Sequence, residues 1–189
     1  MILRSLSIAL LTLLLSACAL SPQYVEIDPD IKINQHINVA HTATLDIEDR
    51  RPQNPLGTRG GVYATTSFIY PSQPLEQGLR PAAIHALQQL GLTTEGLSPK
   101  PIGINLYIDE LSYLAESSSL TVTVTLNCRI SAEINKADRS HQGNFKSSKT
   151  YSYVKSPNEE ENRKIINEIL SETMTRVFND EKLISFIQN

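Results

Sequence analysis

Several residue types that signal whole classes of protein are scarce or absent in this chain of 189 residues. It has no tryptophan and only two cysteines, too few for a disulfide framework. It has no excess of basic residues, with 17 Lys and Arg against 20 Asp and Glu, which argues against nucleic acid and against electrostatic adhesion to anionic lipid. Its longest apolar run is shorter than the roughly 20 residues that a membrane-spanning helix needs.

Sequence motifs that carry chemistry are also missing. The four histidines, His36, His41, His85 and His141, show no spacing typical of metal ligands. There is no Gly-x-Ser-x-Gly motif and no phosphate-binding loop. The sequence therefore predicts no catalytic residue, no metal and no cofactor, and we expect a protein that is not an enzyme.

The N-terminus, by contrast, carries a strong signal. Arg4 precedes an apolar run from Leu6 to Leu15, and small residues follow up to Ala17 and Cys18. This order is typical of a secretory signal peptide, here residues 1–17 with cleavage between Ala17 and Cys18. The remaining residues are enough for one domain with a substantial core.

The tetrapeptide Leu15–Cys18 resembles the bacterial lipoprotein box. The resemblance implies that Cys18 becomes the first residue of the mature chain and carries three acyl chains, palmitate among them. Several chains anchor a protein stably because one chain binds a bilayer only marginally. Ala19 stands where an Asp would retain a lipoprotein at the inner membrane, so the resemblance implies the outer membrane. The alternative is an ordinary secretory signal in which the cysteine is incidental.

Behind the signal, the pattern of apolar residues predicts a lipidated tether over residues 18–36 and one periplasmic domain over 37–189. Period-two alternation predicts strands at 37–47, 62–70, 102–113, 121–134 and 143–154, with a β-bulge after Glu110. Helical spacing predicts helices over about 72–90 and 156–178, followed by a short final helix.

These elements follow in the order β-β-α-β-β-β-α, which is typical of an α+β fold. We expect a two-layer sandwich whose sheet is mainly antiparallel, with about five strands and two amphipathic helices on one face. The second strand is expected to lie antiparallel to the first. The other face of the sheet, rich in Thr, Ser, Asn and Tyr, should stay exposed or meet a partner.

Local signals place the ends of the two helices and one buried thiol. Ser72 is expected to cap the first helix, and Ser156–Glu159 to form a capping box with Pro157 at the first helical position. Cys128 falls on the apolar face of a strand, so we expect a small buried hydrophobic residue and not a reactive thiol.

The most concentrated polar feature is the loop 49–61, which holds Arg50, Arg51 and Arg59. The three guanidinium groups could bind a carboxylate or a glycan phosphate. Alternatively, the nearby carboxylates of Asp46, Glu48 and Asp49 neutralise them in a network that holds the loop.

Together these features are similar to those of the YajG-type lipoproteins of Gram-negative bacteria. The residues that carry the likeness are Cys18, Asp49–Arg50, Gly57–Arg59, Leu90–Gly91 and Asp180. The likeness spans most of the mature chain. It implies an outer-membrane lipoprotein that faces the periplasm, and it transfers no catalytic residue.

Two hypotheses about function remain. The first is a lipid-anchored, non-catalytic module that docks an envelope partner, either a protein or peptidoglycan. The alternative is an enzyme or small-ligand binder that acts on cell-wall or lipid material. A cleft with converging titratable groups would favour the second hypothesis.

Overall fold

The structure of the protein is a computed structural model that describes residues 21–37, 41–60, 66–94 and 101–189. The predictions for the signal peptide, for its cleavage after Ala17 and for lipidation of Cys18 lie outside the described residues. So do parts of the two strands predicted at 37–47 and 62–70.

Three long strands form an antiparallel meander at the centre of the molecule: β6 (Ile102–Ser117), β7 (Val122–Lys136) and β8 (Arg139–Tyr153). Buried and solvent-facing residues alternate along β6 and β7, as the period-two pattern predicts. The register shifts between Ile108 and Glu110, which confirms the predicted bulge. The bulge keeps apolar residues on the core side along the whole of β6.

The sheet is larger than predicted and is mixed, not mainly antiparallel. It has eight strands among the described residues. The five others are β1 (Gln23–Val25), β2 (His41–Asp49), β3 (Gly57–Thr58), β4 (Phe68–Pro71) and β5 (Leu92–Thr93).

Parallel pairings account for the difference from the expected sheet. β2 and β3 both run parallel to β6, one beside each half of that strand, and β5 runs parallel to β2. The connection from β2 to β6 includes a helix, and a crossover of this kind allows parallel pairing. The prediction of an antiparallel partnership between the first two strands is wrong, because β4 pairs with β1 and β3.

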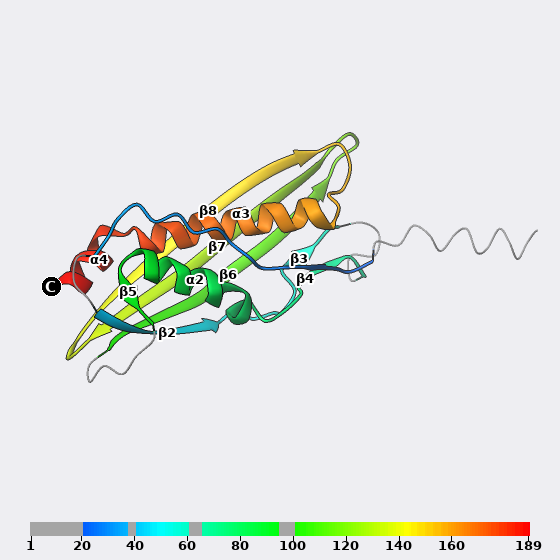
Figure 1. Ribbon diagram of the computed structural model, residues 1–189. Coiled ribbons are helices and arrows are strands. Elements are labelled where there is room, and N and C mark those ends of the chain that lie inside the picture. The colour runs from blue at the N-terminus through cyan, green and yellow to red at the C-terminus, as the bar shows by residue number, and fades with distance from the viewer. Residues whose placement is uncertain (1–20, 38–40, 61–65, 95–100) are drawn as a thin grey trace, which may run out of the picture.

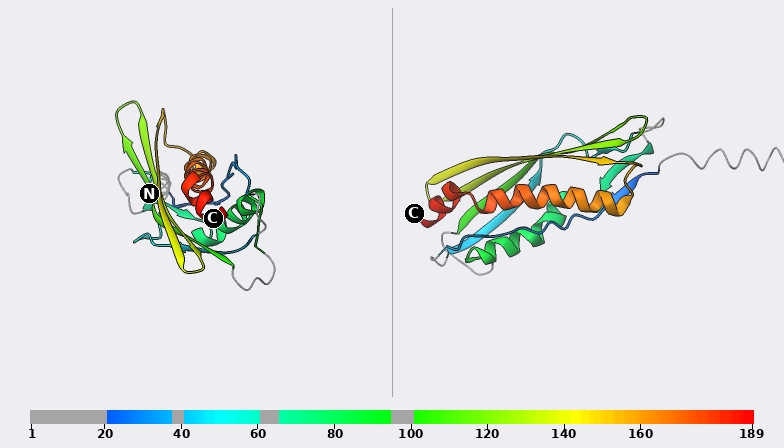
Figure 2. Two further views of the ribbon diagram at one scale, coloured as in Figure 1. Left: turned by 90° about the vertical axis from the view of Figure 1, so that its left-hand side faces the viewer. Right: turned by 90° about the horizontal axis from the view of Figure 1, so that it is seen from above.

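The helices α2 (Leu75–Gln89), α3 (Glu159–Phe178) and α4 (Glu181–Gln188) cover one face of this curled sheet (Figure 1). Helix α3 lies against β7 and β8, and α2 lies against β2 and β5. The view from above shows the long strands as one layer and the helices as the other (Figure 2). The prediction that the helices pack on one face is thus confirmed, and the core lies between the two layers.

The caps of two helices differ from those predicted. Helix α2 begins after Pro74 with no side-chain cap, so Ser72 does not cap it. The capping box of α3 lies two residues later than predicted, since Asn158 accepts from the Glu161 N–H and Glu161 accepts from the Asn158 N–H. Pro157 therefore precedes the cap and does not occupy the first helical position.

The largest correction concerns residues 18–36, predicted as a tether. Residues 23–25 form β1, and residues 26–37, which we call the strap, run along α3 in an extended conformation. Every second residue points into the core, so that Val25, Ile27, Ile31 and Ile37 are all buried. The period-two pattern is present in the sequence, with Pro29 occupying one of the inward positions.

A ladder of hydrogen bonds holds the strap on the helix. The backbone N–H groups of residues 28, 30, 32 and 34 donate to side-chain oxygens at 2.7–3.0 Å, and the four acceptors are Asn167, Ser171, Thr175 and Asn179. Two extended residues rise about 6.6 Å and four helical residues rise about 6 Å, so the two spacings match over several steps.

Candidate functional site

Arg50 lies on the side of the sheet that faces away from the helices. Its Nε and Nη2 atoms both donate to Glu48 Oε2 at 3.1 Å. Its guanidinium carbon is 3.3 Å from the centre of the Tyr107 ring, a cation–π geometry. The hydrogen bonds that Arg50 donates to Glu48 raise the pKa of Arg50 above its ordinary value. The side chain remains 45% exposed, so a partner could still reach it.

Arg51 is turned away from solvent beside the same turn. Its Nε and Nη2 atoms donate to the two carboxylate oxygens of Asp49 at 2.9 and 2.8 Å, a two-point pairing. The same carboxylate also accepts from the Arg51 backbone N–H. Only 4% of the Arg51 side chain is exposed, which suits a role in holding the turn.

Arg59 is buried on the opposite, inner side of the sheet. Its Nη2 atom donates to the carbonyl oxygen of Ser21, where the described chain begins. Burial lowers the pKa of Arg59 below its ordinary value, while the nearby Tyr113 and Glu159 act in the other direction. Arg59 therefore fastens the N-terminal segment and is not presented to solvent.

The three arginines of the predicted loop site are thus not brought together. Two of the carboxylates named in the alternative do pair with loop arginines, while Asp46 lies 3.9 Å from Arg80 of α2. The carboxylate pairs of the alternative are therefore present for Arg50 and Arg51, whereas Arg59 donates to a backbone carbonyl oxygen. Of the three, Arg50 is the one with a half-exposed side chain on a free surface.

Around Arg50 lies a polar surface that we call the outer face, on the side of β2, β6, β7 and β8 that carries no helix (Figure 2). The strand registers set its residues in transverse rows. Two neighbouring rows each cross all four strands. The first consists of Glu48, Tyr107, Ser131 and Asn144, and the second consists of Asp46, Asn105, Glu133 and Gln142.

Hydrogen bonds tie the outer face together. The Tyr107 hydroxyl donates to Glu133 Oε2 at 3.2 Å, and the Ser131 hydroxyl donates to the Asp109 carboxylate. Desolvation, followed by the Glu133 carboxylate, raises the pKa of Tyr107. Tyr107 therefore stays protonated at neutral pH, and its hydroxyl proton is engaged by Glu133.

The sequence predicts a polar face but not these rows. The alternation along each strand was visible, whereas the alignment of Glu48 with Tyr107 depends on the parallel pairing of β2 with β6. No local pattern reports that pairing, because it joins segments about 60 residues apart in the chain.

A cleft of about 240 Å³ lies beside β6. The chain departs from β6 after Asp49, the last residue of β2, and hydrogen-bonds to β6 again at Leu56. The walls of the cleft come from residues 51–57, from Phe68 and from the bulged part of β6. Asp109 and Glu110 contribute carboxylates, and Arg51 contributes a guanidinium that is already paired with Asp49. The cleft also holds the Ser112 hydroxyl, which donates to Glu110 at 3.2 Å, and no histidine is among its lining residues.

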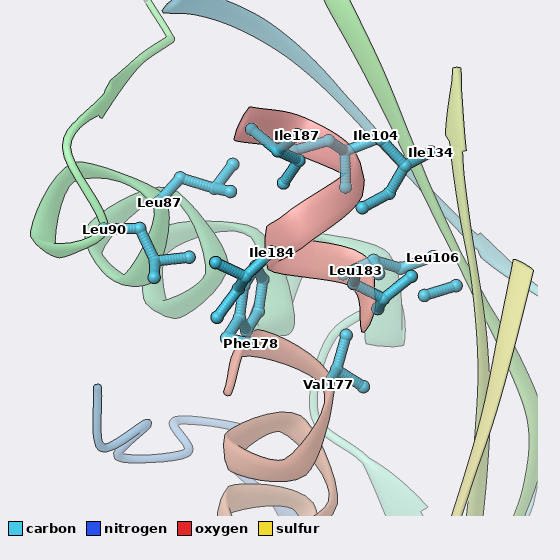
Figure 3. Close-up of a pocket in the computed structure, with 11 residues that line it drawn as sticks. Leu87, Leu90, Ile104, Leu106, Ile134, Val177, Phe178, Leu183, Ile184 and Ile187 are labelled. Carbon is cyan, nitrogen blue, oxygen red and sulfur yellow. The ribbon is translucent and has the colours of Figure 1, made fainter. Parts of the chain in front are cut away.

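A second, internal space lies in the core between α2, α4 and the sheet. Figure 3 shows its lining side chains, which point toward one another from Leu87, Leu90, Ile104, Ile134 and Ile184 among others. It holds only about 20 Å³ and carries no polar side chain, so it is a small packing gap and not a ligand site.

Cys128 is buried, as predicted from its place on the apolar face of β7. Burial raises the pKa of its thiol to about 12, so the thiolate is absent at neutral pH. Over the described ranges, no three His, Cys, Asp or Glu side chains come together as a metal site would require. Nor does any helix in this part of the chain have the length and apolar character needed to cross a membrane.

The fold and the site thus define an elongated α+β scaffold with a complete core on one side of its sheet and an uncovered polar surface on the other. The chain belongs to the lipoprotein family Lipoprotein_16, described as "Uncharacterized lipoprotein", whose model matches residues 29–188. This match confirms the predicted kinship with the YajG-type lipoproteins. No curated protein matches the chain.

Solved structures resemble the fold at low sequence identity. Protein XCC0632 from Xanthomonas campestris, of the family DUF330, is 10% identical with a TM-score of 0.52, covering 89% of this chain and 97% of its own. An uncharacterized protein is 12% identical with a TM-score of 0.47, covering 84% and 97%. The first of these likenesses supports the fold and nothing about function.

Proposed function

We propose that this lipoprotein is a lipid-anchored, non-catalytic module of the outer membrane that faces the periplasm and docks an envelope partner on its outer face. The observation that supports this proposal is the uncovered outer face, where two polar rows cross four strands. A sheet whose second face stays bare can present a wide, flat surface to another molecule.

A protein suits this surface better than peptidoglycan does. The outer face carries four carboxylates, of which Glu48 pairs with Arg50 and Asp46 lies 3.9 Å from Arg80. The other two, Asp109 and Glu133, accept hydrogen bonds from the hydroxyls of Ser131 and Tyr107. Peptidoglycan stem peptides also carry carboxylates, so like charges would meet at the interface. A protein surface that offers basic and amide side chains would complement the outer face.

Photo-crosslinking in intact cells tests this proposal. A benzophenone amino acid replaces Asn144, an exposed residue of the outer face on the edge strand β8, in the full-length chain. A matched control places the same group at Gln88, which is exposed on α2 in the helical layer. We expect one reproducible protein adduct from position 144 and none from position 88, and we expect Arg50→Ala to weaken it.

Other outcomes would contradict the proposal in distinct ways. Muropeptide adducts at position 144 would replace the protein partner with peptidoglycan. No adduct at either position, from a protein that is folded and membrane-bound, would reject the docking role of the outer face. That result would favour the alternative function, a small-ligand binder or an enzyme that acts on cell-wall or lipid material at the cleft beside Arg51.

A further inference from the structure

Two of the large apolar side chains that remain exposed among the described residues lie at one end of the molecule. Leu120 in the β6–β7 turn is 80% exposed, and Val154 just after β8 is 90% exposed. Each lies one or two residues beyond the pair that Val122 forms with Tyr153 at this end of the sheet. We call Leu120 and Val154 the apolar tip.

The described chain begins at the same end. Ser21 accepts a hydrogen bond from Arg59, and the neighbouring Thr58 pairs with Leu114 of β6. Ser21 therefore lies at the level of residue 114 along the sheet. The β6–β7 turn continues past that level by about three residues, or about 10 Å. Figure 1 shows the turn and the first described residues at the same end, opposite the C-terminus.

The lipid that Cys18 is proposed to carry must consequently lie close to the apolar tip. Only Ala19 and Leu20 separate Cys18 from Ser21, a reach of about 10 Å even when fully extended. The strap is fixed on α3, so it adds no slack to this reach. An anchor this short brings the β6–β7 turn to the surface of the bilayer.

The turn itself suits an interface between water and lipid. Ser118 and Thr121 are paired within the turn, since the Ser118 N–H donates to the Thr121 carbonyl oxygen at 2.8 Å and the Thr121 N–H donates to Ser118 Oγ at 3.1 Å. Internal pairing lowers the cost of leaving water. Exposed charges flank the apolar tip at Glu116 and Lys155, where they could remain among the lipid headgroups.

We infer that the apolar tip inserts into the bilayer leaflet that holds the acyl chains of Cys18. The occupant of this surface is thus lipid, and the molecule stands with its β7–β8 turn and C-terminus directed away from the membrane. The inference rests on the proposed lipid anchor. It adds a second contact that fixes the direction in which the outer face is presented.

Depth-dependent fluorescence quenching tests the inference. Lipidated full-length Leu120→Cys is labelled with an environment-sensitive fluorophore and reconstituted into phosphatidylethanolamine–phosphatidylglycerol vesicles that contain spin-labelled lipid. Labelling is selective, because Cys18 is acylated in this protein and Cys128 is buried. Asp138→Cys, in the exposed β7–β8 turn at the far end, is the matched control. We expect a blue shift and strong quenching at position 120 and neither effect at position 138.

Flotation of the same vesicles separates the possible failures. Protein that floats but shows no quenching at position 120 would overturn the insertion and leave the lipid anchor standing. Equal quenching at positions 120 and 138 would overturn the upright orientation. Protein that does not float would overturn the lipid anchor and the insertion together. Burial of position 120 in native membranes but not in vesicles would assign the apolar tip to a protein partner.

Discussion

At the scale of single residues, charge and burial separate side chains that look equivalent in the sequence. Arg50 and Arg59 lie in one loop, yet the first is half exposed over Tyr107 and the second is buried beneath the N-terminal segment. An exposed ion pair contributes little to stability, whereas a buried hydrogen bond from a charged group contributes more.

This difference predicts that two matched substitutions destabilise the protein to different extents. Arg59→Ala should lower the free energy of unfolding by about 1.5–3 kcal/mol, because the Ser21 carbonyl oxygen loses a charged donor. Arg50→Ala should lower it by less than about 1 kcal/mol. Urea unfolding of both variants measures the difference. Equal losses would show that Arg59 does not fasten the N-terminal segment.

The buried thiol of Cys128 predicts a dependence of stability on pH. Its pKa is raised from 9.0 to about 12 in the folded chain, so the folded state holds the proton more tightly than the unfolded state does. The contribution to stability is complete below pH 9.0 and is lost as the pH rises toward 12. We expect the free energy of unfolding to fall as the pH increases through this window.

Tyr107, Tyr113, Tyr151 and Tyr153 have raised pKa values with the same first cause, desolvation, and they add losses of the same sign as the pH rises through 10.0. The thiol begins to contribute at lower pH, and comparison with a variant that lacks it separates its share. Cys128→Ala should be less stable at neutral pH, because it leaves a small cavity, but its stability should change less as the pH rises from 9.0 toward 12. An unchanged slope in the variant would assign the pH dependence to other groups.

At the scale of elements, the sequence predicts what local periodicity encodes and misses what depends on distant pairing. The meander of β6, β7 and β8, the bulge near Glu110 and the stripes of α3 and α4 all follow from runs of consecutive residues. The parallel pairings of β2 and β3 with β6 involve no such run. The same limit applies to the candidate site, since the sequence grouped Arg50 with Arg59 although the sheet separates them.

For Gly78, the sequence of the helix alone predicts the wrong effect of an alanine substitution on stability. A glycine inside a helix normally weakens it, and replacement by alanine stabilises a typical helix by about 1 kcal/mol. In α2, however, a β-carbon on Gly78 would lie 2.7 Å from Cβ of Ile27 in the strap. The glycine is therefore needed for close contact between the helix and the strap.

We expect Gly78→Ala to destabilise the protein despite the better helix propensity of alanine. The clash should outweigh the gain and give a net loss of about 1–3 kcal/mol. Thermal unfolding followed by circular dichroism measures this change. The losses from Gly78→Ala and Ile27→Ala should add to less than their sum in the double variant, since Ile27→Ala removes Cγ2, which would lie 3.0 Å from the new methyl group. A stabilised Gly78→Ala variant would contradict the close packing of the strap.

At the scale of the whole molecule, the N-terminal segment from residue 23 onward is part of the fold. Four backbone N–H groups of the strap bond to α3, and β1 extends the sheet beside β4. This segment, the apolar tip and the outer face therefore keep fixed positions relative to one another. A free tether would allow the domain to turn in any direction.

Two shortened chains distinguish these descriptions when they are exported by a cleavable signal that leaves no lipid. The chain that begins at Ser21 keeps β1 and the strap, and it should fold and unfold cooperatively. The chain that begins at Ile37 loses the buried Val25, Ile27 and Ile31, each worth about 1.5–3 kcal/mol when buried. Their sum, about 5–9 kcal/mol, is comparable with the about 5–15 kcal/mol that stabilises a typical domain. We therefore expect the shorter chain to be largely unfolded by circular dichroism and to be degraded quickly by protease. If both chains had equal stability, residues 21–36 would be a tether after all, and the lipid anchor would set no direction for the outer face.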